Sequence, residues 1–256
     1  MGYSFDLSGR TALVTGASSG LGANFARALA AAGATVVAAA RRADRLDALV
    51  EEIVAAGGEA HAVTMDVADA ASIRAGFAEA EAAVGPINIF VGNAGVAGEH
   101  MALDQPESEI DALLTVNLRG VVLSVQEAAQ RMVASGSADR QDGRIIIIGS
   151  ITAEKIFAGA AVYGATKAAV RHLGRSLARE WARKGINVNV IQPGYFLSEM
   201  TEAMINSELG KRLIGSFPRQ RLRDMTDLNA PLLWLASDAS SGITGTVITV
   251  DDGQSL

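Results

Sequence analysis

Short apolar runs alternate with longer alanine-rich stretches along most of this chain, and this alternation limits the fold more than any other feature. Several runs, such as IIII at 145–148, contain no polar residue. Unbroken runs of branched aliphatic residues are typical of strands covered on both faces, as in a parallel sheet. We predict strands at 11–15, 35–40, 59–65, 88–92, 144–149, 186–192 and 246–250, and helices at 20–32, 43–56, 69–84, 107–134, 161–183 and 226–237.

Repeated strand–helix–strand units predict a Rossmann-type α/β fold, in which helices cover both faces of a doubly wound, parallel, seven-stranded sheet. A chain of 256 residues is long enough for one sizeable core, so we expect a single domain over 1–256. One long interruption at about 194–225 follows the sixth predicted strand. Such a segment, near the carboxyl ends of parallel strands, is interpreted as a substrate lid.

Charge and composition exclude several classes of function. The formal net charge is −6 and no long basic run is present, which makes nucleic acid a poor candidate partner. There is no cysteine, so disulfides and thiolate metal sites are excluded, and no His/Asp/Glu spacing predicts a metal site. No apolar stretch is long enough to span a bilayer and no signal peptide is recognisable. We therefore expect a cytoplasmic protein without a membrane partner.

A glycine-rich turn, TGASSGLG at 15–22, joins the first predicted strand to the first predicted helix. Glycines permit a tight turn and a close backbone approach, and the helix N-terminus offers N–H groups to a pyrophosphate. The spacing is G-x3-G-x-G, which differs from the G-x-G-x-x-G dinucleotide fingerprint. A glycine turn without a ligand therefore stays open as the alternative. The candidate cofactor-binding residues here are Gly16, Ser18, Ser19, Gly20, Leu21 and Gly22.

A second cluster of candidate residues follows the fifth predicted strand. Ser150 ends that strand, and Tyr163 and Lys167 lie on one face of the next long helix at i, i+4 spacing. A lysine ammonium near a phenol favours the phenolate, so we expect Lys167 to lower the pKa of Tyr163 toward the range of acid–base catalysis. Alone, a Tyr-x3-Lys pair is also explained as an ordinary helix-surface pair.

Together, these motifs resemble the short-chain dehydrogenase/reductase family, in its compact single-domain branch, over essentially the whole chain. The matching positions, in chain order, are the glycine turn at 15–22, Asp66 and Val67, the NAG at 93–95, Asn117, Ser150, Tyr163, Lys167 and the PG at 193–194. The resemblance implies hydride transfer between a nicotinamide and a carbonyl or secondary alcohol.

The resemblance also implies a role for each matching residue. Tyr163 would be the general acid or base, Lys167 would lower its pKa and bind the nicotinamide ribose, and Ser150 would orient the substrate oxygen. Asn117 would hold a water for proton relay. Asp66 and Val67 would contact the adenine, and Ser198 stands where the family often has a threonine. The remaining cofactor contacts implied are Asn93, Ala94, Gly95, Pro193, Gly194 and Phe196.

Two arginines at the end of the second predicted strand bear on the choice of cofactor. Ala40 lies 18 residues after Gly22, where an NAD-preferring site has an acid for the ribose 2′-hydroxyl. Ala40 is neutral, and Arg41 and Arg42 follow it, so we predict that Arg41, aided by Arg42, binds the 2′-phosphate of NADP. NADP(H) is thus the expected cofactor, with NAD(H) as the second choice. Two arginines that cap a strand and face water are the alternative.

Several alternatives stay open for the function as a whole. An epimerase or dehydratase of the extended branch also uses a Tyr-x3-Lys pair, and a non-catalytic dinucleotide sensor would need only the glycine turn. The expected substrate is a small, moderately apolar ketone or secondary alcohol, while a polyol, sugar or 3-oxoacyl thioester remains open. The family resemblance implies a homotetramer that buries the helices at 107–134 and 161–183 in one interface and the C-terminal strand in another.

Overall fold

One parallel sheet forms the centre of the computed structural model, which describes residues 5–98, 100–199 and 201–256. In these residues seven strands follow the order β3-β2-β1-β4-β5-β6-β7, and every neighbouring pair is parallel. The strands are β1 (Thr11–Thr15), β2 (Thr35–Ala40), β3 (Glu59–Thr64), β4 (Ile89–Gly92), β5 (Gly143–Ile148), β6 (Ile186–Pro193) and β7 (Val247–Val250). The predicted doubly wound, seven-stranded sheet is confirmed.

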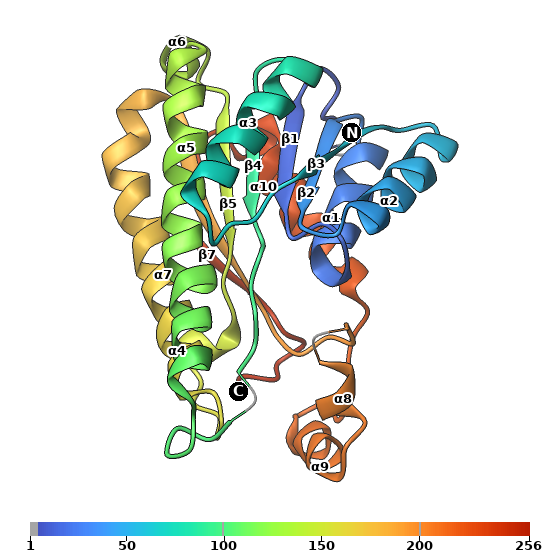
Figure 1. Ribbon diagram of the computed structural model, residues 1–256, viewed down its shortest axis with the longest axis vertical. Coiled ribbons are helices and arrows are strands. Elements are labelled where there is room, and N and C mark those ends of the chain that lie inside the picture. The colour runs from blue at the N-terminus through green and yellow to red at the C-terminus, as the bar shows by residue number, and fades with distance from the viewer. Residues whose placement is uncertain (1–4, 99, 200) are drawn as a thin grey trace.

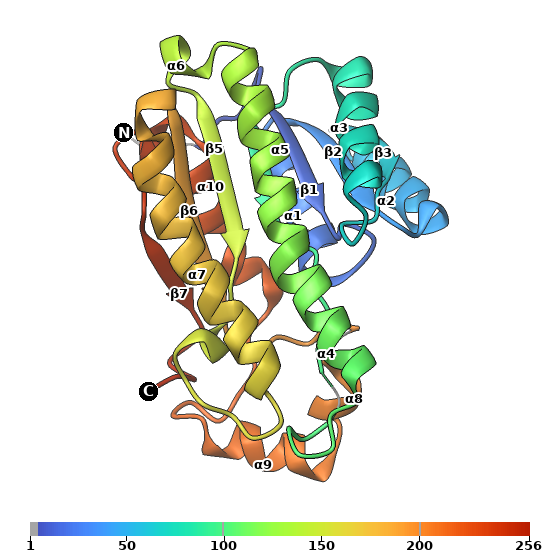
Figure 2. The same cartoon turned by 60° about the vertical axis from the view of Figure 1, so that its left-hand side comes forward.

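Helices cover both faces of the sheet (Figures 1 and 2). One face packs against α1 (Gly20–Ala31), α2 (Ala43–Ala55) and α10 (Asn229–Ala236), whose leucines share a core cluster with Val14 of β1. The other packs against α3 (Ala70–Val84), α5 (Val121–Ala134) and α7 (Ala161–Trp181). Figures 1 and 2 show α5 and α7 side by side on this face.

The isoleucine run of β5 explains why the sheet needs both layers. Ile146 and Ile148 join the cluster beneath α1, α2 and α10, whereas Ile145 and Ile147 join the cluster beneath α3, α5 and α7. Successive strand residues point to opposite faces, so a run without polar residues requires cover on both sides. Each such buried side chain contributes about 1.5–3 kcal/mol relative to exposure.

The single helix predicted at 107–134 is wrong as a continuous α-helix. The structure divides it into α4 (Glu107–Leu114), one π-helical turn (Thr115–Gly120) and α5. The packing of Gly120 against the loop after β3 accompanies this break, because a Cβ at that position would lie 2.8 Å from the Val67 carbonyl oxygen. Periodicity in the sequence does not register a tertiary contact of this kind.

Two short helices, α8 (Glu202–Ile205) and α9 (Glu208–Ser216), occupy the 194–225 segment. They lie beyond the carboxyl ends of the strands, at the end of the molecule opposite α6 (Ser137–Arg140) (Figures 1 and 2). None of the helices in the described residues is both long and apolar enough to cross a membrane. Those residues also contain no group of three His, Asp or Glu side chains placed to hold a metal ion.

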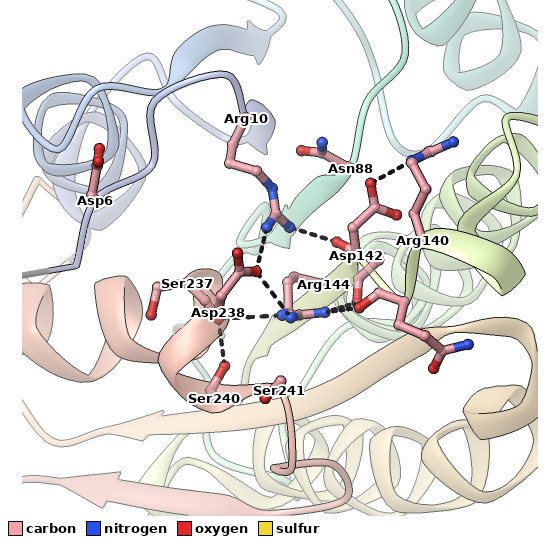
Figure 3. A network of polar contacts seen from close by, with 12 residues as sticks. Asp6, Arg10, Asn88, Arg140, Asp142, Arg144, Ser237, Asp238, Ser240 and Ser241 are labelled. Carbon is pink, nitrogen blue, oxygen red and sulfur yellow. Dashed lines mark hydrogen bonds and ion pairs between the residues drawn. The ribbon is translucent and has the colours of Figure 1, made fainter.

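The amino-terminal edge of the sheet is held by a network of two arginines and one aspartate (Figure 3). Arg10, before β1, donates to the Asp238 carboxylate at 2.8 Å and to the Asp142 carbonyl oxygen at 2.5 Å. Arg144, only 2% exposed, donates to the Gly143 carbonyl oxygen at 3.0 Å and lies 3.4 Å from the same Asp238 carboxylate. The network therefore ties the starts of β1 and β5 to the chain that follows α10.

Candidate active site

The crevice between the loops after β1 and β4 is where the strand order reverses, since β1 continues to β2 on one side and pairs with β4 on the other. Ligands of open α/β sheets bind at this switch point. The Thr15 hydroxyl accepts hydrogen bonds from the Asn93 and Ala94 amides, both at 3.1 Å. The Asn93 side chain donates to the Thr15 carbonyl oxygen at 2.9 Å. These bonds hold the two loops in fixed positions around the crevice.

Close packing explains the glycines of the turn before α1. Gly16 has φ of +69°, which favours glycine, and a Cβ at Gly22 would lie 2.3 Å from the Gly16 carbonyl oxygen. Ser19 occupies the N-cap position of α1, and its side chain forms no capping hydrogen bond with any described residue. The first turn of α1 therefore presents backbone N–H groups toward the crevice, as a pyrophosphate site requires.

Two adjoining cavities occupy the carboxyl edge, and they share Gly16, Ser19, Ala94 and Gly95. Of the residues predicted for the site, the first cavity is also lined by Gly20, Leu21, Asn93, Ser150, Tyr163, Lys167, Pro193, Gly194, Phe196 and Ser198. The second is also lined by Ser18, Arg41, Arg42, Asp66 and Val67. Gly22 and Asn117 lie behind these walls. The sequence therefore predicted about two thirds of the residues that line the two cavities.

Ser150, Tyr163 and Lys167 meet in the first cavity. Ser150 follows β5 and its hydroxyl oxygen accepts hydrogen bonds from the Thr152 amide at 3.2 Å and hydroxyl at 2.9 Å. Tyr163 lies in the first turn of α7. The Lys167 ammonium, one turn later, lies 5.6 Å from the Tyr163 ring centroid and donates to the Ile148 carbonyl oxygen at 3.0 Å. The strand end and the helix start thus bring a hydroxyl, a phenol and an ammonium together.

Burial shifts the pKa values of the two ionisable groups in opposite directions. Desolvation raises the pKa of Tyr163 to about 12, although a hydrogen bond with Ser150 opposes this rise. Desolvation also lowers the pKa of Lys167 to about 8. The direction for Tyr163 is the reverse of the one expected from the Tyr–Lys spacing. The reason is that desolvation dominates, while the Lys167 ammonium donates to a backbone oxygen instead of to the phenol.

Asn117 lies in the π-helical turn between α4 and α5, and this turn directs its side chain inward. The Val96 amide donates to its Oδ1 and its Nδ2 donates to the Val96 carbonyl oxygen, both at 2.8 Å. A Cβ at Gly95 would lie 3.3 Å from Asn117 Oδ1 and 3.7 Å from Lys167 Nζ. Asn117 is therefore a close neighbour of Lys167 and fixes the loop after β4. Single π turns occur frequently at functional sites.

Arg42, more than Arg41, is directed at the glycine turn. Its guanidinium donates to the Ser18 hydroxyl at 3.0 Å and the Ser19 hydroxyl at 2.8 Å, whereas the Arg41 side chain is exposed at the cavity mouth. Asp66 lines the same cavity, and its carboxylate accepts from the Ala68 amide at 2.9 Å. The sequence assigned the leading role to Arg41, because residue order does not reveal which way each side chain leaves the strand end.

Sequence reasoning missed three residues that hold or line the segment after β6. Gln254 accepts from the Tyr195 amide at 2.7 Å and donates to the Tyr195 carbonyl oxygen at 3.1 Å. The Thr201 hydroxyl oxygen accepts from the Ser198 amide at 3.1 Å. Glu199 lines the first cavity. None of the three belongs to a motif that the sequence analysis identified.

An aromatic cluster lies beside the catalytic candidates, on the segments after β5 and β6. The rings of Phe157 and Tyr195 meet edge to face with centroids 5.4 Å apart, and Phe217 stacks on Tyr195 at 6.1 Å. Burial raises the pKa of Tyr195, so its phenol stays protonated at neutral pH. Tyr195 is near enough to raise the pKa of Tyr163, which places this apolar cluster close to Tyr163, although none of its three rings lines the first cavity.

Comparison with known proteins gives a consistent result. The family model for the short chain dehydrogenase matches residues 10–209. The chain is 36% identical to gluconate 5-dehydrogenase of Gluconobacter oxydans over 250 residues, which cover 97% of this chain and 96% of the relative. It is 37% identical to the 3-oxoacyl-[acyl-carrier-protein] reductase of Staphylococcus aureus over 245 residues, or 95% and 97% of the two chains.

A solved structure agrees with these relatives. The gluconate 5-dehydrogenase of Burkholderia cenocepacia, in complex with NADP and tartrate, superimposes with a TM-score of 0.91 at 36% identity. The match covers 98% of this chain and 97% of that one. The overall fold is thus shared with a solved structure that matches over nearly its full length. This protein belongs to the short-chain dehydrogenase/reductase family and is an oxidoreductase.

Proposed function

We propose that this oxidoreductase transfers a hydride between NADP(H) and the carbon of a ketone or secondary alcohol, with Tyr163 as general acid or base. One observation carries the proposal. Ser150, Tyr163 and Lys167 line one of two adjoining cavities, and Arg41 and Arg42 line the other. A proton-transfer group and a phosphate-binding group in adjoining cavities suit a long dinucleotide that reacts at one end only.

The residues present fit this cofactor. The turn at Gly16 and the start of α1 form a cradle that a Cβ at Gly22 would close, which suits a pyrophosphate. Asp66 and Val67 would contact the adenine, and Lys167 would bind the nicotinamide ribose. When bound, the nicotinamide supplies or accepts the hydride. The chain itself supplies orientation and the proton.

The proton chemistry follows from the hydrogen bonds of the site. The Ser150 hydroxyl oxygen accepts from Thr152 Oγ1 and its proton is directed at the Tyr163 phenol, so a substrate oxygen placed between the two would take over the Ser150 proton. Tyr163, with its pKa raised to about 12, is protonated at neutral pH and is ready to donate a proton to a carbonyl oxygen. In the reverse direction the tyrosinate takes the proton of the alcohol, and the nearby Lys167 ammonium favours that anion.

A preference for NADP(H) over NAD(H) is supported by the neutral Ala40 and by Arg42. A guanidinium fork suits phosphate oxygens, and the strand itself ends in a neutral alanine where an NAD-preferring site has an acid. We expect kcat/KM with NADPH to exceed kcat/KM with NADH. We also expect Arg42→Ala to remove most of that difference and Arg41→Ala to reduce it less. Equal kcat/KM with both cofactors in the wild type would contradict the preference.

The reaction class is tested with a panel of ketones, secondary alcohols, sugar acids and polyols, read at 340 nm with each cofactor. The aromatic cluster of Phe157, Tyr195 and Phe217 supports a moderately apolar ketone or alcohol as the best substrate. Preferred turnover of a polyol or a sugar acid would contradict this choice of substrate class. Cofactor that remains tightly bound and is not consumed would favour an epimerase or dehydratase, and binding without any turnover would favour a sensor.

A homotetramer is supported by apolar residues on the outer face of α4 and α5. Leu114 is 43% exposed, and Val122 and Val133 are similarly exposed along the same side of the molecule. β7 is an edge strand with a half-buried face, which would suit a second interface. Size-exclusion chromatography with light scattering tests this, and a monomer at micromolar concentration would contradict it.

A further inference from the structure

Glu199 reaches across the crevice to the arginine-lined end. It lies in the 194–225 segment, one residue after Ser198, and it lines the first cavity. Its two carboxylate oxygens lie 3.1 and 3.2 Å from Arg42 Nη1, and one of them lies 2.9 Å from Arg45 Nη1. Hydrogen bonds from Arg42, Arg45 and Ser19 lower the pKa of Glu199 to about 2. The carboxylate is therefore ionised at neutral pH.

The guanidinium of Arg42 binds both the glycine turn and Glu199. Its Nε and Nη2 donate to the hydroxyls of Ser18 and Ser19, which fixes the plane of the group over the glycine turn. Its Nη1 faces Glu199. A phosphate bound by this fork would require the Nη1 donor that Glu199 now engages. The carboxylate thus lies where a phosphate oxygen of the cofactor would have to lie.

Electrostatic repulsion makes it unfavourable for the Glu199 carboxylate and a phosphate to bind Arg42 at the same time. A phosphomonoester carries close to two negative charges at neutral pH and has three acceptor oxygens, so it competes strongly for arginines. The arginine pairs of Glu199 are half-exposed, and exposed pairs contribute little stability. An incoming phosphate can therefore displace the carboxylate at small cost.

We infer that Glu199 determines cofactor specificity by occupying the anion place on Arg42 and Arg45, which the 2′-phosphate of the cofactor takes over on binding. This inference rests on the proposed use of NADP(H). The exchange frees the segment after β6 from the glycine turn when a 2′-phosphate arrives. A cofactor with a 2′-hydroxyl leaves the pairs of Glu199 in place. Glu199 therefore weakens the binding of NADP(H) selectively.

Binding of two adenosine fragments to the full-length protein isolates this effect from turnover. Isothermal titration calorimetry with adenosine 2′,5′-bisphosphate and adenosine 5′-monophosphate is run on the wild type, Glu199→Gln, Arg42→Ala and Glu202→Gln. Glu202 is an exposed acid at the start of α8, so its variant removes the same charge from the same segment. We expect Glu199→Gln to bind the bisphosphate about three- to tenfold more tightly than the wild type and the monophosphate within about twofold of it. Glu202→Gln should change neither affinity.

The other outcomes would overturn the inference about Glu199, the proposed NADP preference, or both. Unchanged bisphosphate affinity in Glu199→Gln, together with a loss in Arg42→Ala, would show that Glu199 does not compete for the phosphate place. Weaker affinity in Glu199→Gln would show that the carboxylate orients Arg42 for phosphate, and would also overturn the inference. If the wild type does not distinguish the fragments but Glu199→Gln prefers the bisphosphate, the proposed NADP preference fails while the inference stands. If neither protein distinguishes them, both fail.

Discussion

Polar side chains have opposite roles at the amino ends and at the carboxyl ends of the strands. At the amino edge, Arg10 and Arg144 share the Asp238 carboxylate and donate to backbone carbonyl oxygens (Figure 3). At the carboxyl ends of the same two strands, β1 and β5, the glycine turn and Ser150 face a cavity. Polar groups directed at one another stabilise the fold, whereas polar groups directed at a cavity are available to a ligand.

Burial lowers the pKa of one cation at the amino ends of the strands and of one cation at their carboxyl ends. Desolvation lowers the pKa of Arg144 and also that of Lys167. Arg144 stays charged because the pKa of a free guanidinium is far above neutrality, and the Asp238 carboxylate opposes the shift. The pKa of Lys167 comes within reach of neutral pH, so this ammonium can release a proton. The residue type therefore decides whether a buried cation serves structure or proton transfer.

Replacement of Tyr163 with Phe should produce the largest effect of all. It removes the proton donor and leaves the ring, so we expect kcat/KM to fall about 10²- to 10⁴-fold while the fold is kept. Steady-state assays at 340 nm and a circular dichroism melt measure the two quantities. Tyr195→Phe is the matched control, because that phenol lies in the aromatic cluster, and its loss should change kcat/KM far less. Near-normal turnover by Tyr163→Phe would contradict its role.

At the amino ends of the strands, Arg144→Met should lower the free energy of unfolding without changing kcat. The change leaves several buried carbonyl oxygens without their donor, so we expect the free energy of unfolding to fall by about 2–4 kcal/mol. Urea unfolding measures this, and kcat per folded molecule should stay close to wild type. Arg140→Met removes an exposed arginine from the same region and should cost under about 1 kcal/mol. A comparable loss in both variants would contradict the special role of the buried network.

The buried lysine predicts a dependence of stability on pH. Unfolded, Lys167 holds its proton up to about pH 10.5, but folded only up to about pH 8. Between these values the unfolded chain binds the extra proton, so the contribution of this group to stability rises with pH. Tyr163 acts in reverse, but only above about pH 10, because its folded pKa is raised. Urea unfolding at about pH 7.5 and 9.5 therefore separates the two groups.

Lys167→Met should remove that rise, so the difference in unfolding free energy between this variant and the wild type should change with pH. Lys184→Met, at an exposed lysine, serves as the control and should follow the wild type. A wild type whose stability does not rise relative to Lys167→Met over this range would show that Lys167 is not desolvated in the folded protein.

The smallest effect concerns the segment after β6. Thr201→Val removes the acceptor of the Ser198 amide and the donor to the Phe196 carbonyl oxygen. We expect KM for the cofactor to rise about two- to fivefold with kcat little changed, because the loop that lines the cavity loses a local hydrogen bond. Thr244→Val removes a similar acceptor from Val188 at a distance from the site and should leave KM unchanged. Equal effects would indicate a general loss of stability.

The sequence predicted the sheet, the two layers and most of the cavity lining because these features follow local rules. The run at 145–148 alternates between the two faces, and the glycine turn follows its strand directly. The features missed depend on contacts between distant segments. The break before α5 accompanies the packing of Gly120 on Val67, and the position of Glu199 depends on arginines more than 150 residues earlier.

The π turn at Thr115–Gly120 makes the position of Asn117 depend on the number of residues in the turn. Each residue of an α-helix turns the next by about 100°, so the extra residue in this turn sets the rotational phase between α4 and α5. Leu113 on one side and Val121 on the other are both buried in this phase. Deletion of one residue from the turn would give a smoother helix but would turn one of these helices out of the core. The bonds of Asn117 to the Val96 backbone therefore depend on this number of residues, and we expect the turn to be intolerant of insertion and deletion.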